Sequence, residues 1–244
     1  MTYCLAIKVD DGIVFASDSR THAGVDHASV YSKMYRFALN QDRVIVLLAA
    51  GSLATTQALI NRLERDLFEV RQGMNLNGAV SLFDAAHYVG RVSVEEQSRH
   101  CEALQRCGFS AEATFILGGQ IAGQAPEIFL IYPQGNCITP PPQSPFLQIG
   151  ESKYGKPILS RMIEPPLSLE DAARCALVSL DSTMKSNITV GPPIDLLLYR
   201  KDALQVDQRL SYDLTSPYYA TLQRQWASGI RAAFDHLPRF DWER

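Results

Sequence analysis

The strongest constraint in this sequence is that a core strand begins almost at the first residue. The segments YCLAIKV at 3–9 and IVFAS at 13–17 flank Asp10-Asp11-Gly12, and an Asp-Gly pair between two apolar runs is typical of a β-hairpin. Terminal residues are usually poorly ordered unless neighbouring structure ties them down. The hairpin therefore predicts a fold that holds Thr2 in a fixed position at the start of a strand.

The remaining sequence predicts further strands, two pairs of helices and a terminal helix. A second strand pair, at about 34–39 and 43–50, comes before any helix, and its second strand is apolar on both faces, which indicates a central strand. Capping residues and helical periodicity predict helices from Ser52 to about 70, over 81–105, over 152–163 with interruptions at Gly155 and Pro157, over 168–182, and over 218–235. Strand patterns occur at 113–121, 127–133, 146–150, 188–191, 194–200 and near 204–211.

This order of elements limits the architecture. Runs of strands that alternate with pairs of helices favour two antiparallel sheets face to face, with helices on the outside. Alternating β–α crossovers are absent, which argues against a doubly wound or TIM-type parallel sheet. The predicted fold class is α+β, a four-layer αββα sandwich. Because no linker or repeat interrupts the chain, residues 1–244 are predicted to form one domain, with 213–244 as a C-terminal helical extension.

The composition argues against several classes of partner. The chain is 46% hydrophobic and 20% charged with a net charge of −3, and its pI is about 6.0. It therefore offers no broad basic surface for nucleic acid or anionic lipid. The longest apolar stretch, Val44–Ala50, is far shorter than the ~20 residues of a membrane helix. We expect no nucleic-acid or membrane partner and a cytoplasmic location.

The cysteines support this location. The five cysteines form an odd set without a CxxC pair, which suits a reducing compartment better than a disulfide framework. His100 beside Cys101, with Cys107 six residues further on, resembles a metal-binding fragment. Six residues along a helix, however, point to a different face. We therefore predict no metal site, and the sequence indicates no cofactor.

Thr2 combines two chemical groups that could act together. Removal of Met1, which is common before a small residue, would leave Thr2 with a free α-amine. Because such an amine has a reference pKa of about 7.7–8.0, nucleophile and base would lie in one residue. The hairpin returns Asp18 beside Thr2, and Lys33 near the amine would lower its pKa while Asp18 keeps the lysine charged. Alternatively, Thr2 is a frayed end and 17–20 a solvated strand end.

Several motifs resemble those of one known family. The threonine start, the S-D-x-R strand end, the lysine before a third strand and the LLAAGSLATTQ passage resemble a proteasome β-type subunit, and they are similar to the bacterial HslV peptidase. The match continues through FILGG, QIGESKYG, LDSTMKSN and IDLLLY and covers about residues 2–200. The first 26 residues and the long C-terminal tail most resemble the bacterial Anbu branch. The resemblance implies the N-terminal nucleophile hydrolase fold.

The same resemblance implies roles for individual residues. Thr2 is the nucleophile with its amine as the base, and Asp18 and Lys33 set the local charge. The amide N–H of Gly51 stabilises the tetrahedral oxyanion, which suits a position before a helix N-terminus, where unpaired N–H groups favour negative charge. The alternative for Gly51 is a simple strand-to-helix turn. Three further residues align with supports of the threonine amine in relatives, although each could instead cap a helix: Ser152, Asp181 and Ser186.

The sequence also departs from the family pattern. Lys33 lies one residue closer to the threonine than in the commoner proteasome spacing, a shortening that the Anbu branch shares. The passage GESK stands where the most similar peptidases have a GSGG-like run, and it places Glu151 and Lys153 near a site that small residues usually line. If Met1 is retained, the Thr2 nitrogen is an amide and cannot act as a base.

These features predict a threonine-type endopeptidase that cleaves peptides or unfolded proteins through an acyl-enzyme, within a self-assembled homo-oligomeric ring or helical stack. An ATP-dependent unfoldase is an open partner class. One alternative is a proteolytically silent or conditionally active assembly subunit. It is motivated by GESK and by a tail rich in residue types favoured between chains: Trp226, Phe234, Phe240 and Trp242. That tail helix could instead close its own core. Another alternative is a hydrolase of small amides.

Overall fold

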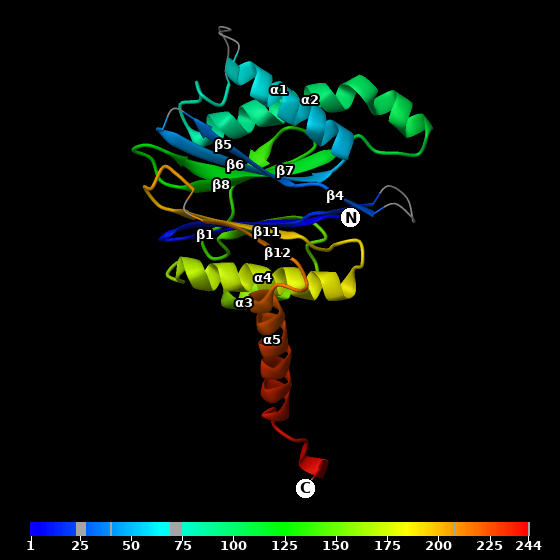
Figure 1. The fold of residues 1–244 in the computed structure, drawn as a ribbon, viewed down its shortest axis with the longest axis vertical. Helices are drawn as coiled ribbons and strands as arrows, with labels where there is room; N and C mark the ends of the chain where they lie inside the picture. Colours follow the sequence, from blue (N-terminus) through cyan, green and yellow to red (C-terminus); the bar gives the residue numbers. More distant parts are fainter. Residues whose placement is uncertain (23–27, 40, 69–74, 207, 244) are drawn as a thin grey trace.

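The computed structural model describes residues 1–22, 28–39, 41–68, 75–206 and 208–243. Two five-stranded antiparallel sheets lie face to face, and a pair of helices covers the outer face of each sheet (Figure 1). This arrangement confirms the predicted α+β sandwich of two antiparallel sheets. A two-stranded ribbon and a projecting C-terminal helix complete the described elements.

The first sheet contains the hairpin at the start of the chain. Its strands are β1 (Tyr3–Val9), β2 (Gly12–Asp18), β10 (Phe146–Gly150), β11 (Ile194–Arg200) and β12 (Gln208–Tyr212). Their order is β10-β1-β2-β11-β12, so β1 lies between β2 and β10. The hairpin register pairs Cys4 with Ser17, and Asp10 and Asp11 form the turn. The residues before β1 are therefore held beside the last residues of β2, as predicted.

The second sheet is built around one buried and mostly apolar strand. Its strands are β5 (Met34–Leu39), β6 (Arg43–Gly51), β7 (Ala113–Ile121), β8 (Glu127–Ile131) and β9 (Cys137–Ile138). They lie in sequence order, with β6 between β5 and β7. Every residue of β6 is buried except the last. The apolar pattern of 43–50 thus correctly predicted a central strand.

Two helix pairs cover the sheets, and one further helix leaves the sandwich. The helices are α1 (Leu53–Phe68), α2 (Leu82–Arg106), α3 (Lys156–Met162), α4 (Leu169–Ser186) and α5 (Pro217–Asp235), followed by a 3-10 turn η1 (Asp241–Glu243). The side chain of Ser81 caps α2 and that of Ser168 caps α4. Within the described part of the chain, no helix combines the length and apolar character needed to cross a bilayer.

The core has three apolar layers that match the stacking in Figure 1. One layer lies between the two sheets and includes Phe15, Leu48 and Tyr199. A second joins the first sheet to α3 and α4, and a third joins the second sheet to α1 and α2. Packing on both faces explains why β1 and β2 are buried almost throughout. The position of Thr2 at the start of β1 is therefore fixed by the centre of the fold.

Four predicted elements need correction. Six strands rather than four precede α1 within the described residues, because β3 (Arg20–His22) and β4 (Ala28–Val30) form a ribbon whose strands are too short to show an alternating pattern. Residues 188–191 form a turn instead of a strand. Pro157 lies in the first turn of α3 rather than interrupting it, where its missing N–H is not needed. The helix predicted over 168–182 extends to residue 186.

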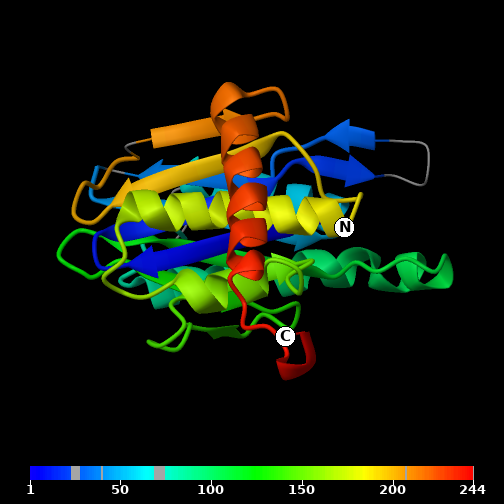
Figure 2. The same ribbon diagram turned by 90° about the horizontal axis from the view of Figure 1, so that it is seen from below.

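The C-terminal helix does not close a core of its own. α5 leaves the sandwich on the side of α3 and α4 and points away from it (Figures 1 and 2). Tyr219 is its single buried residue among those described. Leu222 packs partly against the layer beneath, whereas Phe234 is 70% exposed. The apolar face predicted for 218–235 is therefore largely uncovered in the single chain.

Candidate active site

Thr2 is held by its own contact with Glu151 and by the contacts of the next residue with Gly150 and Asp18. Its carbonyl oxygen accepts a hydrogen bond from the Glu151 N–H at 2.7 Å. The next residue, Tyr3, pairs with Gly150 and donates its N–H to Asp18 Oδ1 at 3.0 Å. Gly150 has a φ of +80°, and a side chain there would overlap the Thr2 carbonyl. The sheet therefore orders the start of the chain, and glycine at 150 permits the close approach.

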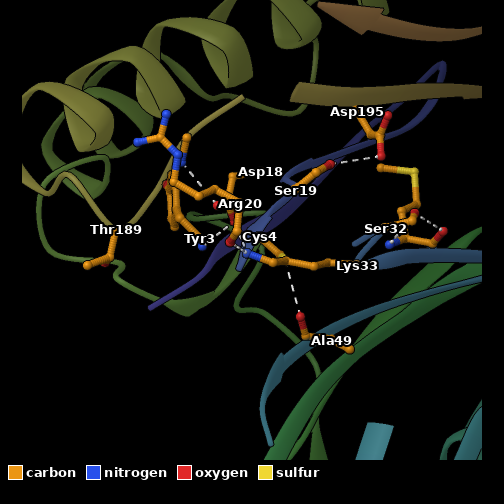
Figure 3. Close-up of polar contacts among 12 residues, drawn as sticks. Tyr3, Cys4, Asp18, Ser19, Arg20, Ser32, Lys33, Ala49, Thr189 and Asp195 are labelled. Atoms are coloured by element: carbon orange, nitrogen blue, oxygen red, sulfur yellow. Dashed lines mark hydrogen bonds and ion pairs between the residues drawn. The ribbon is translucent and has the colours of Figure 1, made fainter. Parts of the chain in front are cut away.

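A buried ion pair lies directly beside this strand (Figure 3). Lys33 Nζ is 2.8 Å from Asp18 Oδ1 and also donates to the Arg20 carbonyl at 2.7 Å. The other carboxylate oxygen of Asp18 accepts the Gly191 N–H at 3.1 Å. Burial raises the pKa of the Asp18 carboxyl, while Lys33 and the N–H groups of Tyr3 and Gly191 oppose that effect. Because every partner of Asp18 is a donor, the contacts match an ionised carboxylate.

Lys33 also joins this pair to the second sheet. Its carbonyl oxygen accepts the Ala49 N–H at 3.0 Å, which ties it to β6. Thr2, Lys33 and Gly51 line one small cavity of about 40 Å³, whose walls include Tyr35. The structure thus brings Thr2, Asp18, Lys33 and Gly51 together from two sheets.

Gly51 ends β6 and immediately precedes a helix. Its φ is +109°, and a side chain at this position would overlap the carbonyl oxygen of Glu112. Ser52 follows and caps α1, because its Oγ accepts the Thr55 N–H at 3.3 Å, as the sequence predicted. The amide of Gly51 therefore lies at the positive end of the α1 dipole, beside the cavity that Thr2 lines.

The α-amine of the chain lies among these charges. Burial and the positive charge of Lys33 lower the pKa of the Met1 amine, and Asp18 and Glu151 act in the opposite direction. The Thr2 nitrogen is a peptide amide while Met1 is attached, and its lone pair is delocalised into the carbonyl group, so it cannot act as a base. The surroundings therefore favour the neutral form of an amine near Thr2. Thr2 itself has a free α-amine only after Met1 is removed.

The three remaining predicted residues have other contacts. Ser152 accepts the Lys156 N–H through its carbonyl oxygen, just before α3. Asp181 is buried in α4, and its two oxygens accept from Lys185 and from Gln223 of α5, each at 2.6 Å. Ser186 is exposed at the last residue of α4. The roles predicted for these three at the threonine amine stay predictions.

Glu151 is a further polar residue beside Thr2, and the sequence predicted no role for it. Glu151 is 5% exposed, and its Oε2 accepts from Asn187 Nδ2 at 2.8 Å. Its Oε1 is 3.2 Å from Lys153 Nζ. Asn187 Oδ1 in turn accepts from the N–H and hydroxyl of Thr189. The sequence signal for Glu151 was its position directly after the strand at 146–150. In the structure this strand pairs with β1.

Comparisons with known proteins agree with this geometry. The sequence model of the family described as "Proteasome subunit" matches residues 2–197. The chain belongs to the proteasome subunit family. Among curated proteins, it is similar to a proteasome subunit beta from Haloquadratum walsbyi, with 26% identity over 215 residues that cover 87% of this chain and 79% of that protein.

Solved structures place the chain in the Anbu branch of the proteasome subunit family, as predicted. An Anbu (Gly-1) mutant from Hyphomicrobium sp. strain MC1 has a TM-score of 0.92 and 38% identity, and the match covers 99% of this chain and 100% of that chain. Anbu (ancestral beta-subunit) from Yersinia bercovieri has a TM-score of 0.91 and 38% identity, with 98% of each chain covered. The structure described as a helical assembly of the Anbu complex from Pseudomonas aeruginosa has a TM-score of 0.90 and 42% identity, again with 98% of each chain covered.

Proposed function

We propose that this proteasome-family chain is a threonine-type endopeptidase whose nucleophile is Thr2 after removal of Met1. The observation that carries the proposal is the cavity shared by Thr2, Lys33 and Gly51, with the Asp18–Lys33 pair buried behind it. These groups provide a nucleophile, a positive charge near the future base, and a helix N-terminus for an oxyanion.

The proposed reaction begins when Thr2 Oγ attacks the carbonyl carbon of a peptide bond and the α-amine of Thr2 takes the hydroxyl proton. The carbonyl electron pair moves to oxygen, and the Gly51 N–H stabilises the resulting oxyanion. When the carbonyl re-forms, the C–N bond breaks and the ammonium passes its proton to the leaving amine. The ester on Thr2 is then attacked by water, whose proton returns through the amine to the Thr2 oxygen as the ester bond breaks.

Lys33 and Asp18 have electrostatic roles in this scheme. Lys33 lowers the pKa of the nearby amine, so more of the amine is neutral and able to act as a base at neutral pH. Asp18 keeps Lys33 in place through the 2.8 Å ion pair. Neither group needs to exchange a proton with the substrate. Loss of either one should therefore reduce the rate without removing the nucleophile itself.

The proposed substrates are peptides or unfolded protein segments. Attack by Thr2 needs an accessible peptide bond, and most backbone groups of a folded protein are paired within its secondary structure. An ATP-dependent unfoldase is accordingly the class of partner that could supply folded proteins in extended form. All five cysteines are free, which supports the proposed cytoplasmic location.

The experiment combines N-terminal processing with reactivity. We expect the intact mass to show loss of Met1, and a peptide with a terminal epoxyketone to add covalently to Thr2 and to block hydrolysis of a fluorogenic peptide. Thr2→Ala should remove both adduct and hydrolysis, whereas Thr221→Ala on α5 should change neither. Retained Met1, or hydrolysis by Thr2→Ala equal to that of the unaltered chain, contradicts the proposal. A panel of small amides, assayed in parallel with the peptides, tests the alternative that the protein is a hydrolase of small amides.

Self-association is the second part of the proposal, and it is also the function of a silent assembly subunit. The supporting observation is the uncovered apolar surface at the C-terminal end, where Phe234 is 70% and Trp242 is 77% exposed. Substituting Phe234→Ser and Trp242→Ser together should reduce the oligomer size measured by light scattering. Truncation after Tyr212 tests the same surface more severely. An oligomer of unchanged size in both variants would remove α5 from the assembly interface, and assembly without any hydrolysis would favour the silent subunit.

A further inference from the structure

Glu151, whose side chain is buried, is bonded to Thr2 through its main chain. The Glu151 N–H donates to the Thr2 carbonyl oxygen at 2.7 Å, so the two residues are fixed relative to each other. The Glu151 side chain is 5% exposed and is therefore confined to the protein interior beside the start of β1. Asn187 holds one carboxylate oxygen at 2.8 Å, and Lys153 holds the other at 3.2 Å.

The two carboxylates that influence the α-amine are not equally available to it. Asp18 accepts from Lys33, from the Tyr3 N–H and from the Gly191 N–H. Each oxygen of Glu151 has one donor contact among the described residues. A carboxylate offers about four lone-pair sites. Glu151 therefore keeps acceptor capacity that an ammonium group can use.

The charges around the amine are few and come from three segments. Lys33 before β5 and burial lower the pKa of the Met1 amine, while Asp18 of β2 and Glu151 after β10 act in the opposite direction. Lys153 is paired with Glu151 and its side chain is 68% exposed, and Tyr35 lines the adjoining cavity. Lys33 is thus opposed by two carboxylates, of which Glu151 is the one without a buried cation of its own.

An amine that serves as a general base becomes a cation at the moment it acts. Catalytic bases are commonly oriented by a third group that also stabilises the charge they acquire. We propose that Glu151 is this positioning residue: its carboxylate orients the α-amine of processed Thr2 and stabilises the ammonium that forms when the amine takes the hydroxyl proton. This inference rests on the proposed function. It assigns to Glu151 the support that the sequence predicted for Asp181 and Ser186.

The test measures the α-amine directly and in parallel with activity. The processed full-length chain is compared with Glu151→Gln, with Glu151→Asp, and with Glu164→Gln as a matched control on an exposed glutamate before α4. Competitive acetylation with trace acetic anhydride at a series of pH values, read by mass spectrometry of the N-terminal peptide, gives the titration of the Thr2 amine. The pH dependence of kcat/KM for a fluorogenic peptide is recorded on the same samples.

Glu151→Gln should shift the amine titration and the acidic limb of kcat/KM to lower pH, because removing a nearby negative charge destabilises the ammonium. It should also lower kcat/KM at its optimum by roughly 10²-fold through the misplaced base. Glu151→Asp should restore much of the titration shift, and Glu164→Gln should match the unaltered chain. A merely structural glutamate could lower activity, but it would leave the amine titration in place.

Two different results would overturn this inference. If Met1 is removed but the Thr2 amine titrates identically in Glu151→Gln, Glu151→Asp and the unaltered chain, the role of Glu151 is overturned. The proposed function is not affected by that result, because the acetylation readout does not require peptidase activity. Retention of Met1 overturns the proposed function, and the role of Glu151 with it. Circular dichroism of each variant shows whether it is folded, and Glu151→Asp keeps the charge if Glu151→Gln does not fold.

Discussion

Two buried aspartates mark two different regions of this molecule. Asp18 at the end of β2 is 0% exposed, and Asp181 in α4 is 1% exposed. Each accepts from a lysine, at 2.8 Å from Lys33 and at 2.6 Å from Lys185. The sequence predicted roles near the Thr2 amine for both residues, and in the structure the two differ in the groups that surround them.

The difference lies in the partners. The Lys33 side chain is 8% exposed, whereas that of Lys185 is 56% exposed. Main-chain N–H groups complete the shell of Asp18, while the side chain of Gln223 completes that of Asp181. Asp18 is therefore part of an enclosed charge pair beside Thr2, and Asp181 is a contact between α4 and the projecting α5. Equal burial of a residue type does not indicate an equal role.

The largest effect should come from the enclosed lysine. Lys33→Met leaves the Asp18 carboxylate buried without its cation, and we expect a loss of about 3–5 kcal/mol in the free energy of unfolding. Lys185→Met removes an exposed partner and should cost about 1 kcal/mol or less. Urea unfolding of both variants, followed by circular dichroism, measures the contrast. Equal losses would show that enclosure of the lysine does not distinguish the two regions.

A smaller effect is expected where α5 meets α4. Asp181→Asn keeps the shape of the side chain but weakens its contacts with Lys185 and Gln223, and we expect a loss of about 1–2 kcal/mol in the local stability of α5. Amide hydrogen exchange of 217–235 should accelerate by roughly 5- to 30-fold. The control is Glu170→Gln, which removes an exposed charge from the first turn of α4, the helix that also carries Asp181. Unchanged exchange in Asp181→Asn would mean that packing of Tyr219 alone holds α5.

The smallest effects should come from two buried serines. Ser179 Oγ of α4 is 2.7 Å from the Tyr3 hydroxyl, so Ser179→Ala should cost about 1 kcal/mol. Ser17 Oγ of β2 is buried without a hydrogen-bond partner among the described residues, so Ser17→Ala should change stability by less than about 0.5 kcal/mol. Thermal unfolding resolves the order of the two. A larger loss for Ser17→Ala would reveal a partner of its hydroxyl in the assembled protein.

Much of the fold followed from local patterns. The strands at 113–121 and 146–150 have the predicted bounds, because long alternating or apolar runs specify both a strand and its buried face. The three-residue strands of the β3–β4 ribbon are too short to show such a pattern. Residues 188–191 were mistaken for a strand because ITVG is rich in β-branched residues. The Asn187 side chain and carbonyl instead bond the amides of 189 and 190 and form a turn.

The candidate site was partly accessible from the sequence. The hairpin alone returns Asp18 to the start of β1, and the contact between Asp18 and the Tyr3 N–H follows from that register. The contact between Glu151 and Asn187 joins residues 36 positions apart. It depends on how β10 and the end of α4 pack together, and no local pattern records that packing.

The sequence by itself determined that two antiparallel sheets pack together and that Thr2 directly precedes a core strand, because alternation, turns and caps act over a few residues. Only the tertiary structure decided that the buried Glu151 carboxylate accepts from Asn187 while Asp181 accepts from Gln223 of α5. The physical reason is that the interior has little water to solvate a charge, so each buried carboxylate depends on donors that distant segments bring to it.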